Sequence, residues 1–145
     1  NEKNVYIPMG KTYDMKATLE NMKGNFAIQG EIAGPGIQKN PLGLRELEFF
    51  VFNIYDIDKQ KYMDTILMKE LCFSLGLKSV PIDQFFTFNH TLEDLLQIAQ
   101  GTYMLTNNPR EGIVIRPVTE MFSGVLRGRL SFKVLNNIYL EKEKE

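Results

Sequence analysis

Apolar and polar side chains alternate along residues 26–32, with Phe26 and Ile28 on one parity and Gln29 and Glu31 on the other. This alternation is typical of a strand with one half-buried face, because successive side chains point to opposite sides of a sheet. The pattern therefore predicts a strand whose polar face carries a carboxamide at Gln29 and a carboxylate at Glu31.

A glycine-rich segment surrounds this carboxylate. Gly30 leaves room beside Glu31, and Gly34-Pro35-Gly36 predicts a tight turn, because glycine permits positive φ and proline fixes its own φ. A carboxylate at the end of a rigid strand beside such a turn suits contact with ribose hydroxyls or with a metal. A solvated strand end is the alternative interpretation.

Residues 48–56 form a nearly continuous apolar run, which predicts a strand buried on both faces at the centre of a sheet. Its aromatic residues are expected in the core, although one of them could instead stack on a base. The alternation places Phe50, Phe52 and Ile54 on one face and Phe49, Val51, Asn53 and Tyr55 on the other.

Helical spacing of apolar residues predicts three helices. The first covers residues 13–23, with Gly24 expected at its C-terminal cap, the second covers residues 64–75, and the third begins at the capping residue Thr91. The second has Asp64 as its expected N-cap and Gly76 at its expected C′ position. The expected buried residues are Met15, Leu19 and Met22; Leu67, Leu71 and Leu75; and Leu92, Leu95, Leu96 and Ala99.

Further strands are predicted within residues 110–117 and 130–135 and at residues 5–9, where Pro8 favours a sheet edge. Residues 85–88 are aromatic and prone to form a strand as well. The fold class that follows is α+β, with largely antiparallel sheets and flanking helices.

Composition narrows the class of protein. A length of 145 residues suits one domain, and no apolar stretch approaches the roughly 20 residues of a membrane span. The polar start has no signal peptide and no Met, which suggests a piece of a longer chain. Cys72 is the only cysteine, so a reducing, cytoplasmic location is compatible.

The net charge of −1 argues against a chain that is basic throughout and wraps nucleic acid. The segment from Arg110 to Lys133 nevertheless carries five basic and two acidic side chains, so a local positive face could bind phosphates. The only histidine, His90, has no spaced partners for a metal or for acid–base chemistry and is expected to be structural.

The order Gly-Glu-x-x-Gly-Pro-Gly-Ile-Gln at residues 30–38 resembles nucleotidyl motif III of the RNA ligase 2 family. That family belongs to the covalent nucleotidyltransferases, with the DNA ligases and the mRNA capping enzymes. The resemblance implies an ATP-grasp-like DNA/RNA ligase domain in which Glu31 contacts the ribose of ATP.

Val-Phe-Asn-Ile at residues 51–54 is similar to motif IIIa of the same family. The resemblance implies that the Phe52 ring stacks on the adenine of ATP. Asn53 stands where these enzymes often have Asp, so a hydrogen-bonding side chain is kept and a negative charge is lost.

Two later segments complete the resemblance. Glu-Gly-Ile-Val-Ile-Arg at residues 111–116 looks like motif IV, which implies that Glu111 lies near a catalytic Mg²⁺ or Mn²⁺ and that Arg116 replaces a frequent Lys. Gly112, at the start of this strand, is expected to allow the close approach of a ligand. Ser-Phe-Lys-Val at residues 131–134 resembles motif V, which implies that Lys133 contacts the α-phosphate of ATP. This form of motif V is similar to the one in bacterial RNA ligases with an N-terminal OB domain.

The motif I lysine, within Lys-x-Asp-Gly, is absent from residues 1–145. The resemblance therefore implies the C-terminal portion of a ligase nucleotidyltransferase domain, truncated or cleaved from a longer enzyme and inactive alone. The whole enzyme would join RNA 3′-hydroxyl and 5′-phosphate ends, nicked or duplex, through lysyl-AMP. The implied catalytic residues are Lys133 and Glu111, the nucleotide-binding residues are Glu31, Phe52, Asn53, Arg116 and Lys133, and the metal ligand is Glu111.

Two alternatives stay open at this stage. A non-catalytic nucleotide- or RNA-binding remnant would have little use for the carboxylates at Glu31 and Glu111. A DNA ligase or a capping-type guanylyltransferase is disfavoured by the Gly-Pro-Gly-Ile-Gln extension at residues 34–38.

Overall fold

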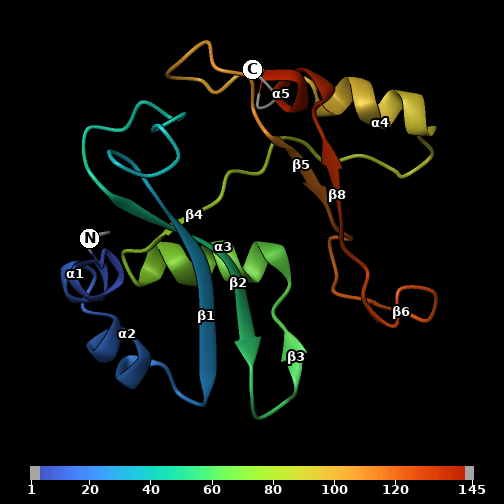
Figure 1. Ribbon diagram of the computed structural model, residues 1–145. Helices are drawn as coiled ribbons and strands as arrows, with labels where there is room; N and C mark the ends of the chain where they lie inside the picture. Colours follow the sequence, from blue (N-terminus) through green and yellow to red (C-terminus); the bar gives the residue numbers. More distant parts are fainter. Residues whose placement is uncertain (1–3, 143–145) are drawn as a thin grey trace.

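The structure is a computed structural model, and it describes residues 4–142 (Figure 1). The helices are α1 (Tyr6–Thr12), α2 (Met15–Asn21), α3 (Thr65–Ser74), α4 (Leu92–Ala99) and α5 (Asn137–Lys142). The strands are β1 (Phe26–Ala33), β2 (Glu48–Asp56), β3 (Lys61–Tyr62), β4 (Lys78–Ser79), β5 (Gly112–Ile115), β6 (Phe122–Ser123), β7 (Gly128–Arg129) and β8 (Phe132–Leu135).

The first sheet contains strands β1 to β4, with β2 at its centre. β2 pairs antiparallel with β1 and β3 and parallel with β4. Helix α3 packs on one face of this sheet (Figure 1). The antiparallel strands and flanking helices confirm the α+β prediction. The fully or nearly buried residues of this core are Met22, Val51, Ile54, Met68, Cys72 and Leu77.

A β-bulge in β2 overturns the predicted division of its faces. Gln29 pairs with Asn53 and Gly30 pairs with Val51, so Phe52 is an extra residue without a partner on β1. Val51 and Ile54 are both fully buried although they are three residues apart. The alternation assumed an unbroken strand, and one inserted residue exchanges the faces of every residue beyond it.

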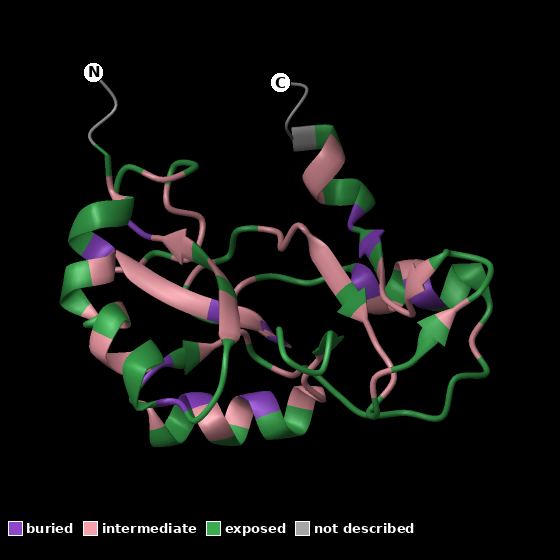
Figure 2. Cartoon of the chain, turned by 90° about the horizontal axis from the view of Figure 1, so that it is seen from below, coloured by how far each residue is buried: buried purple, intermediate pink, exposed green. Residues whose placement is uncertain are grey.

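The second sheet is smaller. β5 and β8 pair antiparallel, and α4 packs on one of their faces through Leu95 and Ala99 against Val134. The capping box at the start of α4 is confirmed, because Thr91 and Asp94 exchange both side-chain–backbone hydrogen bonds. β6 and β7 form a separate short hairpin. Figure 2 shows that buried residues are few here and more frequent around β2 and α3.

Two predicted strands are absent. The segment 6–12 is helix α1 rather than an edge strand, because Pro8 lies in the first helical turn, where its missing N–H is not required. The short strand after α3 is Lys78–Ser79, and residues 85–88 are not a strand. There Phe86 and Phe88 pack on the ring of His90 instead of joining a sheet.

The helix boundaries follow the capping signals in part. Gly76 ends α3 as predicted, since it has φ +68° and Leu77 N–H donates to Cys72 O in a Schellman motif. Asp64 precedes α3 but makes no capping hydrogen bond; its carboxylate accepts from Glu120 N instead. The C-cap of α2 is Met22, two residues before Gly24.

Some residues expected in the core are exposed, because the face of each helix that packs on the protein differs from the face that the sequence predicted. On α3 the buried positions are Met68 and Cys72, while Leu67 is exposed. Burial raises the pKa of the Cys72 thiol, consistent with a packed hydrophobic role. Leu19 of α2 and Leu92 of α4 are exposed as well.

No helix in the described part of the chain is long and apolar enough to span a membrane. The predicted solvated tail at residues 141–145 falls mostly outside the described residues: Glu141 is exposed at the end of α5, and residues 143–145 are not described.

Candidate functional site

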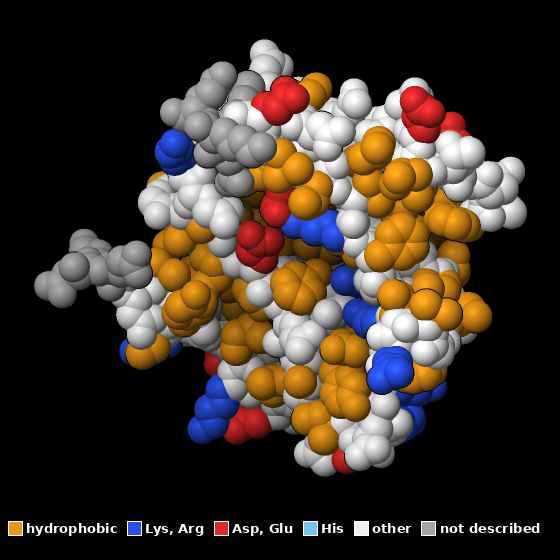
Figure 3. All heavy atoms as spheres, turned by 45° about the vertical axis from the view of Figure 1, so that its right-hand side comes forward, with side chains coloured by type: hydrophobic (Ala, Val, Ile, Leu, Met, Phe, Trp, Pro, Cys, Tyr) orange, Lys and Arg blue, Asp and Glu red, His pale blue; other side chains and the backbone are white. Residues whose placement is uncertain are grey.

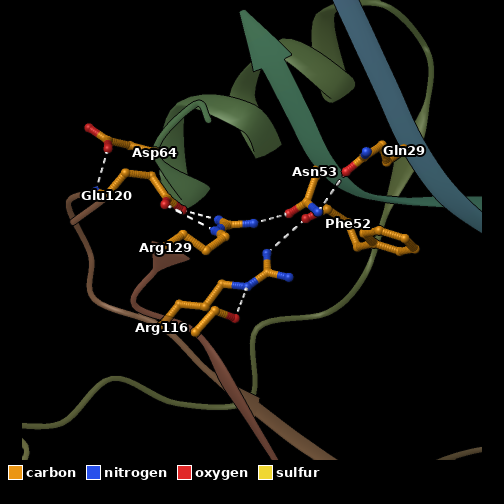
Figure 4. Close-up of polar contacts among 8 residues, drawn as sticks. Gln29, Phe52, Asn53, Asp64, Arg116, Glu120 and Arg129 are labelled. Atoms are coloured by element: carbon orange, nitrogen blue, oxygen red, sulfur yellow. Dashed lines mark hydrogen bonds and ion pairs between the residues drawn. The ribbon is translucent and has the colours of Figure 1, made fainter. Parts of the chain in front are cut away.

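The bulge in β2 presents an aromatic ring at the junction of the two sheets. Phe52 is half-buried, and it belongs to neither of the core clusters found within residues 4–142. Figure 4 shows its ring extending away from Arg116 and Arg129. Bulges commonly redirect side chains beside functional sites, and a ring held in this way can stack on a base.

Arg116 joins the two sheets at this bulge. It follows β5, and its Nη1 donates to the Phe52 carbonyl at 2.8 Å while its Nε donates to Ser131 Oγ at 3.3 Å. Burial lowers the pKa of Arg116, as does the nearby charge of Arg129, with Glu120 acting in the opposite direction. The guanidinium remains charged at neutral pH, because an arginine starts from a very high pKa.

A second arginine holds the neighbouring residue of the bulge. Arg129, in β7, donates from Nη1 to Asn53 Oδ1 and from Nε and Nη2 to the Glu120 carboxylate (Figure 4). Its guanidinium also lies 4.1 Å from the centre of the Tyr62 ring. Asn53 in turn donates from Nδ2 to Gln29 Oε1 at 2.9 Å.

Glu111 and Lys133 form an ion pair on the second sheet. Their side chains are 45% and 43% exposed, so both remain accessible to a ligand. Lys133 stands opposite Val114, on the face of the strand pair away from α4, because its neighbours Phe132 and Val134 pack toward α4. The two residues implied as catalytic are thus in direct contact.

Gly112 does not act as the sequence suggested. An added Cβ would lie 2.1 Å from the Val134 carbonyl, and its φ is +153°. The close approach that requires glycine is therefore that of strand β8, not that of a ligand. The unusual backbone also turns Glu111 out of the regular alternation of β5, beside Lys133.

Glu31 lies apart from these contacts. It is exposed on β1 opposite Phe50, one pair beyond the bulge. Gly30 leaves no room beside it: an added Cβ would lie 2.5 Å from the Phe49 ring and 2.6 Å from the Phe50 carbonyl. The predicted turn does follow, with Gly36 at φ +85° and Ile37 N–H donating to Gly34 O.

The basic residues of the segment 110–133 have different surroundings. Arg110 is not available to phosphate, because it donates to the carbonyls of Ala99, Ile98 and Gln100 at the end of α4 and pairs with Asp83. On the face of the molecule shown in Figure 3, Lys and Arg side chains lie in a broken line between two apolar areas, with acidic side chains beside its upper part. A line of cations of this kind suits phosphate groups.

The donor set fits a divalent metal that arrives with a nucleotide. Within residues 4–142, no group of three or more His, Cys, Asp or Glu side chains is placed to hold a metal. Mg²⁺ is commonly bound by one or two carboxylates together with substrate phosphates and water. The Glu111 carboxylate is a hard oxygen donor of that type, and the Lys133 ammonium beside it is the kind of cation that pairs with a phosphate.

Several side chains of the junction were missed by sequence reasoning. A local pattern cannot reveal their contacts, because most of the partners are far away in the chain; Arg129 and Asn53 are 76 residues apart. The sequence indicated Gln29 only as a polar residue of its strand and Asp64 only as a helix cap. The missed residues are Gln29, Asp64, Glu120, Arg129 and Ser131.

Solved structures with the same architecture come from the RNA ligase of Naegleria gruberi. The structure of that ligase with pyrophosphate is 35% identical, with a TM-score of 0.84. A Lys-to-Ala variant with ATP and Mn is 34% identical (TM-score 0.85), and a Lys-to-Met variant with AMP and Mn is 35% identical (TM-score 0.84). In each case the match covers 99% of this chain and 42% of the ligase chain.

The present chain therefore spans less than half the length of the ligases that it resembles. A search of curated proteins found no match. The family model of the RNA ligases matches residues 2–135, which is nearly the whole chain. Together with the structural similarity at 35% identity, this match shows that the chain belongs to the RNA ligase family.

Proposed function

We propose that this chain is the later part of the nucleotidyltransferase domain of an ATP-dependent RNA ligase. The whole enzyme joins an RNA 3′-hydroxyl to a 5′-phosphate through lysyl-AMP and RNA-adenylate. Its substrates are nicked or duplex RNA ends, its site is completed by the upstream part of the same protein, and it works in the cytoplasm. Family membership and a relative solved with ATP and Mn support the nucleotide assignment.

One observation carries the proposal. The aromatic residue at the β2 bulge is joined through Arg116 to the sheet that carries the Glu111–Lys133 pair. A platform for a base and a cation–carboxylate pair for phosphate and metal are therefore held in a fixed relation. A protein that only bound RNA would need the cations and the ring but not the carboxylate.

Each side chain has a part in binding ATP. Phe52 stacks on the adenine, Glu31 contacts the ribose, and Lys133 contacts the α-phosphate. Arg116 and Asn53 hold the bulge in place and border the base. Glu111 is a ligand for Mg²⁺ or Mn²⁺, which when bound withdraws charge from the phosphates and favours their substitution.

The chemistry is transfer of a nucleotidyl group in three steps. The amine of an upstream lysine attacks the α-phosphorus of ATP, the bond to the bridging oxygen breaks, and pyrophosphate leaves. The RNA 5′-phosphate then displaces that lysine, and the 3′-hydroxyl finally displaces AMP. Positioning and charge neutralisation dominate such reactions. Lys133 contributes because its ammonium leaves the Glu111 carboxylate and instead neutralises the negative charge that develops on the α-phosphate.

Labelling with α-³²P-ATP tests the proposal. The chain alone, with Mn²⁺, is expected to form no covalent AMP adduct, because it has no motif I lysine. Adding the upstream segment in trans, or fusing it, is expected to restore label on the upstream lysine. A stable adduct on the chain alone contradicts the assignment of the nucleophile, and no label in the joined protein favours the non-catalytic remnant.

A further inference from the structure

A directed chain of hydrogen bonds crosses the junction from Arg129 to Gln29. Arg129 donates to Asn53 Oδ1, and Asn53 Nδ2 donates to Gln29 Oε1 at 2.9 Å (Figure 4). Arginine has donors and no acceptor, so the oxygen of Asn53 must face it. The amide nitrogen of Asn53 then faces Gln29 and donates, so Gln29 must accept with its side-chain oxygen.

Arg129 is held too firmly to change this direction. Its side chain is 16% exposed, it binds the Glu120 carboxylate through two nitrogens, and it stacks on the Tyr62 ring. Glu120 is itself fixed, because its backbone N–H donates to Asp64 at 2.7 Å. The direction of donation along the three hydrogen-bonded side chains is thus set at their buried end, by Arg129.

The outward end of this series of hydrogen bonds is the amide nitrogen of Gln29. Gln29 is exposed, stands opposite Asn53, and lies on β1 next to the point where Phe52 is inserted. Its oxygen is occupied by Asn53, and within the described chain its Nε2 has no partner. The structure therefore presents a donor, not an acceptor, beside the aromatic platform.

We propose that Gln29 is a specificity-determining residue that reads the base held on Phe52 through its amide NH₂, and that Arg129 is the positioning residue that sets this polarity through Asn53. The inference rests on the proposed function of the site. An NH₂ donor matches a ring nitrogen with a free lone pair, as adenine has at N1. It repels the N–H that guanine carries there, so it favours ATP over GTP.

Gln29→Glu tests the donor directly. The change keeps an oxygen toward Asn53 and replaces the outward NH₂ by a carboxylate oxygen, with almost no change in shape. In the ligase that joins this chain to its upstream segment, we expect the kcat/KM ratio of ATP to GTP in adenylylation to fall at least about tenfold. Gln97→Glu, the same exchange at an exposed position of α4, is the matched control and is expected to leave the ratio unchanged.

Asn53→Asp tests the relay. An aspartate offers only acceptors, so Gln29 must turn its NH₂ toward residue 53 and its oxygen outward. The ATP-to-GTP ratio is expected to fall as it does in Gln29→Glu, without any change at Gln29 itself. A purely structural role for Asn53 predicts equal losses with both nucleotides.

Two substitutions at Arg129 separate polarity from packing. Arg129→Lys keeps a residue that can only donate, so the rate falls while the ATP-to-GTP ratio is retained. Arg129→Met removes the donor and frees the Asn53 amide to turn over, so the ratio falls about threefold. Equal ratios in these two variants would remove Arg129 from the relay.

The outcomes distinguish this inference from the proposed function. If the wild-type joined protein forms no lysyl-AMP, the proposed function fails and the inference fails with it. If the wild type is labelled but Gln29→Glu and Asn53→Asp keep the wild-type ratio, only the inference is overturned. Because Gln29 is exposed and its exchange is nearly isosteric, loss of folding does not obscure the result.

Discussion

The two sheets of the molecule are stabilised in different ways. Around β2 and α3, side chains such as Val51, Ile54 and Met68 are completely or almost completely removed from water. The β5–β8 pair and α4 have a smaller apolar core, whose buried residues within the described chain are Leu95, Ala99 and Val134. The β5–β8 region carries instead the Glu111–Lys133 ion pair and Arg116, and the separate β6–β7 hairpin carries Arg129.

The contrast separates an apolar scaffold from an accessible polar surface. The first sheet has an apolar interior, which fixes the position of the β2 bulge. The β5–β8 pair and the separate β6–β7 hairpin are joined to it by hydrogen bonds. Arg116, after β5, donates to the Phe52 carbonyl, and Arg129 of β7 donates to Asn53. Asp64, which precedes α3, accepts from Glu120 N. Such bonds are directional, so they set the orientation of one sheet on the other in a way that apolar contacts do not.

The largest expected effect is on stability and tests whether the first core dominates. Ile54→Ala removes a fully buried side chain and is expected to cost about 3–5 kcal/mol of unfolding free energy, whereas Val134→Ala in the second core costs about 1–2 kcal/mol. Urea denaturation of both variants measures this. Equal losses would mean that the two cores contribute alike.

The next effect separates chemistry from stability. Lys133→Ala in the joined ligase is expected to lower the rate of lysyl-AMP formation at least about 100-fold, because a cation that meets the growing charge on phosphate is lost. Its half-exposed position predicts little change in urea midpoint. Lys61→Ala, at an exposed position of β3, is the control, and undiminished labelling of Lys133→Ala would remove Lys133 from the site.

Arg116 probes the bridge between the two sheets. Arg116→Met keeps most of the buried stem and removes the hydrogen bonds to the Phe52 carbonyl and Ser131. We expect ATP binding to weaken about tenfold, since a bond to a charged group contributes about 1.5–3 kcal/mol. Equilibrium binding of ATP to the joined ligase measures it. Wild-type affinity would show that the bulge is held without the second sheet.

The smallest effect concerns a charge in the scaffold. The hydrogen bonds donated by Lys59 Nζ and by Lys59 N lower the pKa of Asp56, despite burial acting in the opposite direction. The carboxylate therefore stabilises the folded state above its unfolded pKa of about 3.9, and the contribution disappears as the pH falls through the lower folded value.

Accordingly, Asp56→Asn is expected to have a lower urea midpoint than the wild type at pH 7. The difference is expected to shrink as the solution is acidified below the ordinary carboxyl range. Glu70→Gln, at an exposed position of α3, should show no such trend. A difference that stays constant with pH would show that Asp56 acts through its shape and not through its charge.

Local patterns predicted the elements that local interactions control. The alternation at residues 26–32 gave β1, the apolar run at 48–56 gave β2, and the Thr91 capping box and Gly76 gave the ends of two helices. The predicted edge strand at residues 5–9 was wrong, because a proline in a first helical turn and a proline at a sheet edge look alike in the sequence.

For the candidate site, the motifs named candidate residues but not the contacts between them. The sequence named Glu111 and Lys133 separately, and the fold pairs them. It named Phe52 on an assumed regular face, and the fold places that ring on a bulge. It attributed open space to Gly30 and Gly112, and the fold fills both spaces with its own atoms.

By itself, the sequence determined the family, the main strands and helices, and the residues that the family motifs assign to a nucleotide site. These features depend on periodicity and on motifs a few residues long, so they can be predicted without knowing which distant residues make contact. Only the tertiary structure decided the bulge in β2, the two arginine contacts and the polarity that reaches Gln29. Those features join residues 24 to 76 positions apart, and no local pattern encodes which distant group will satisfy a given donor.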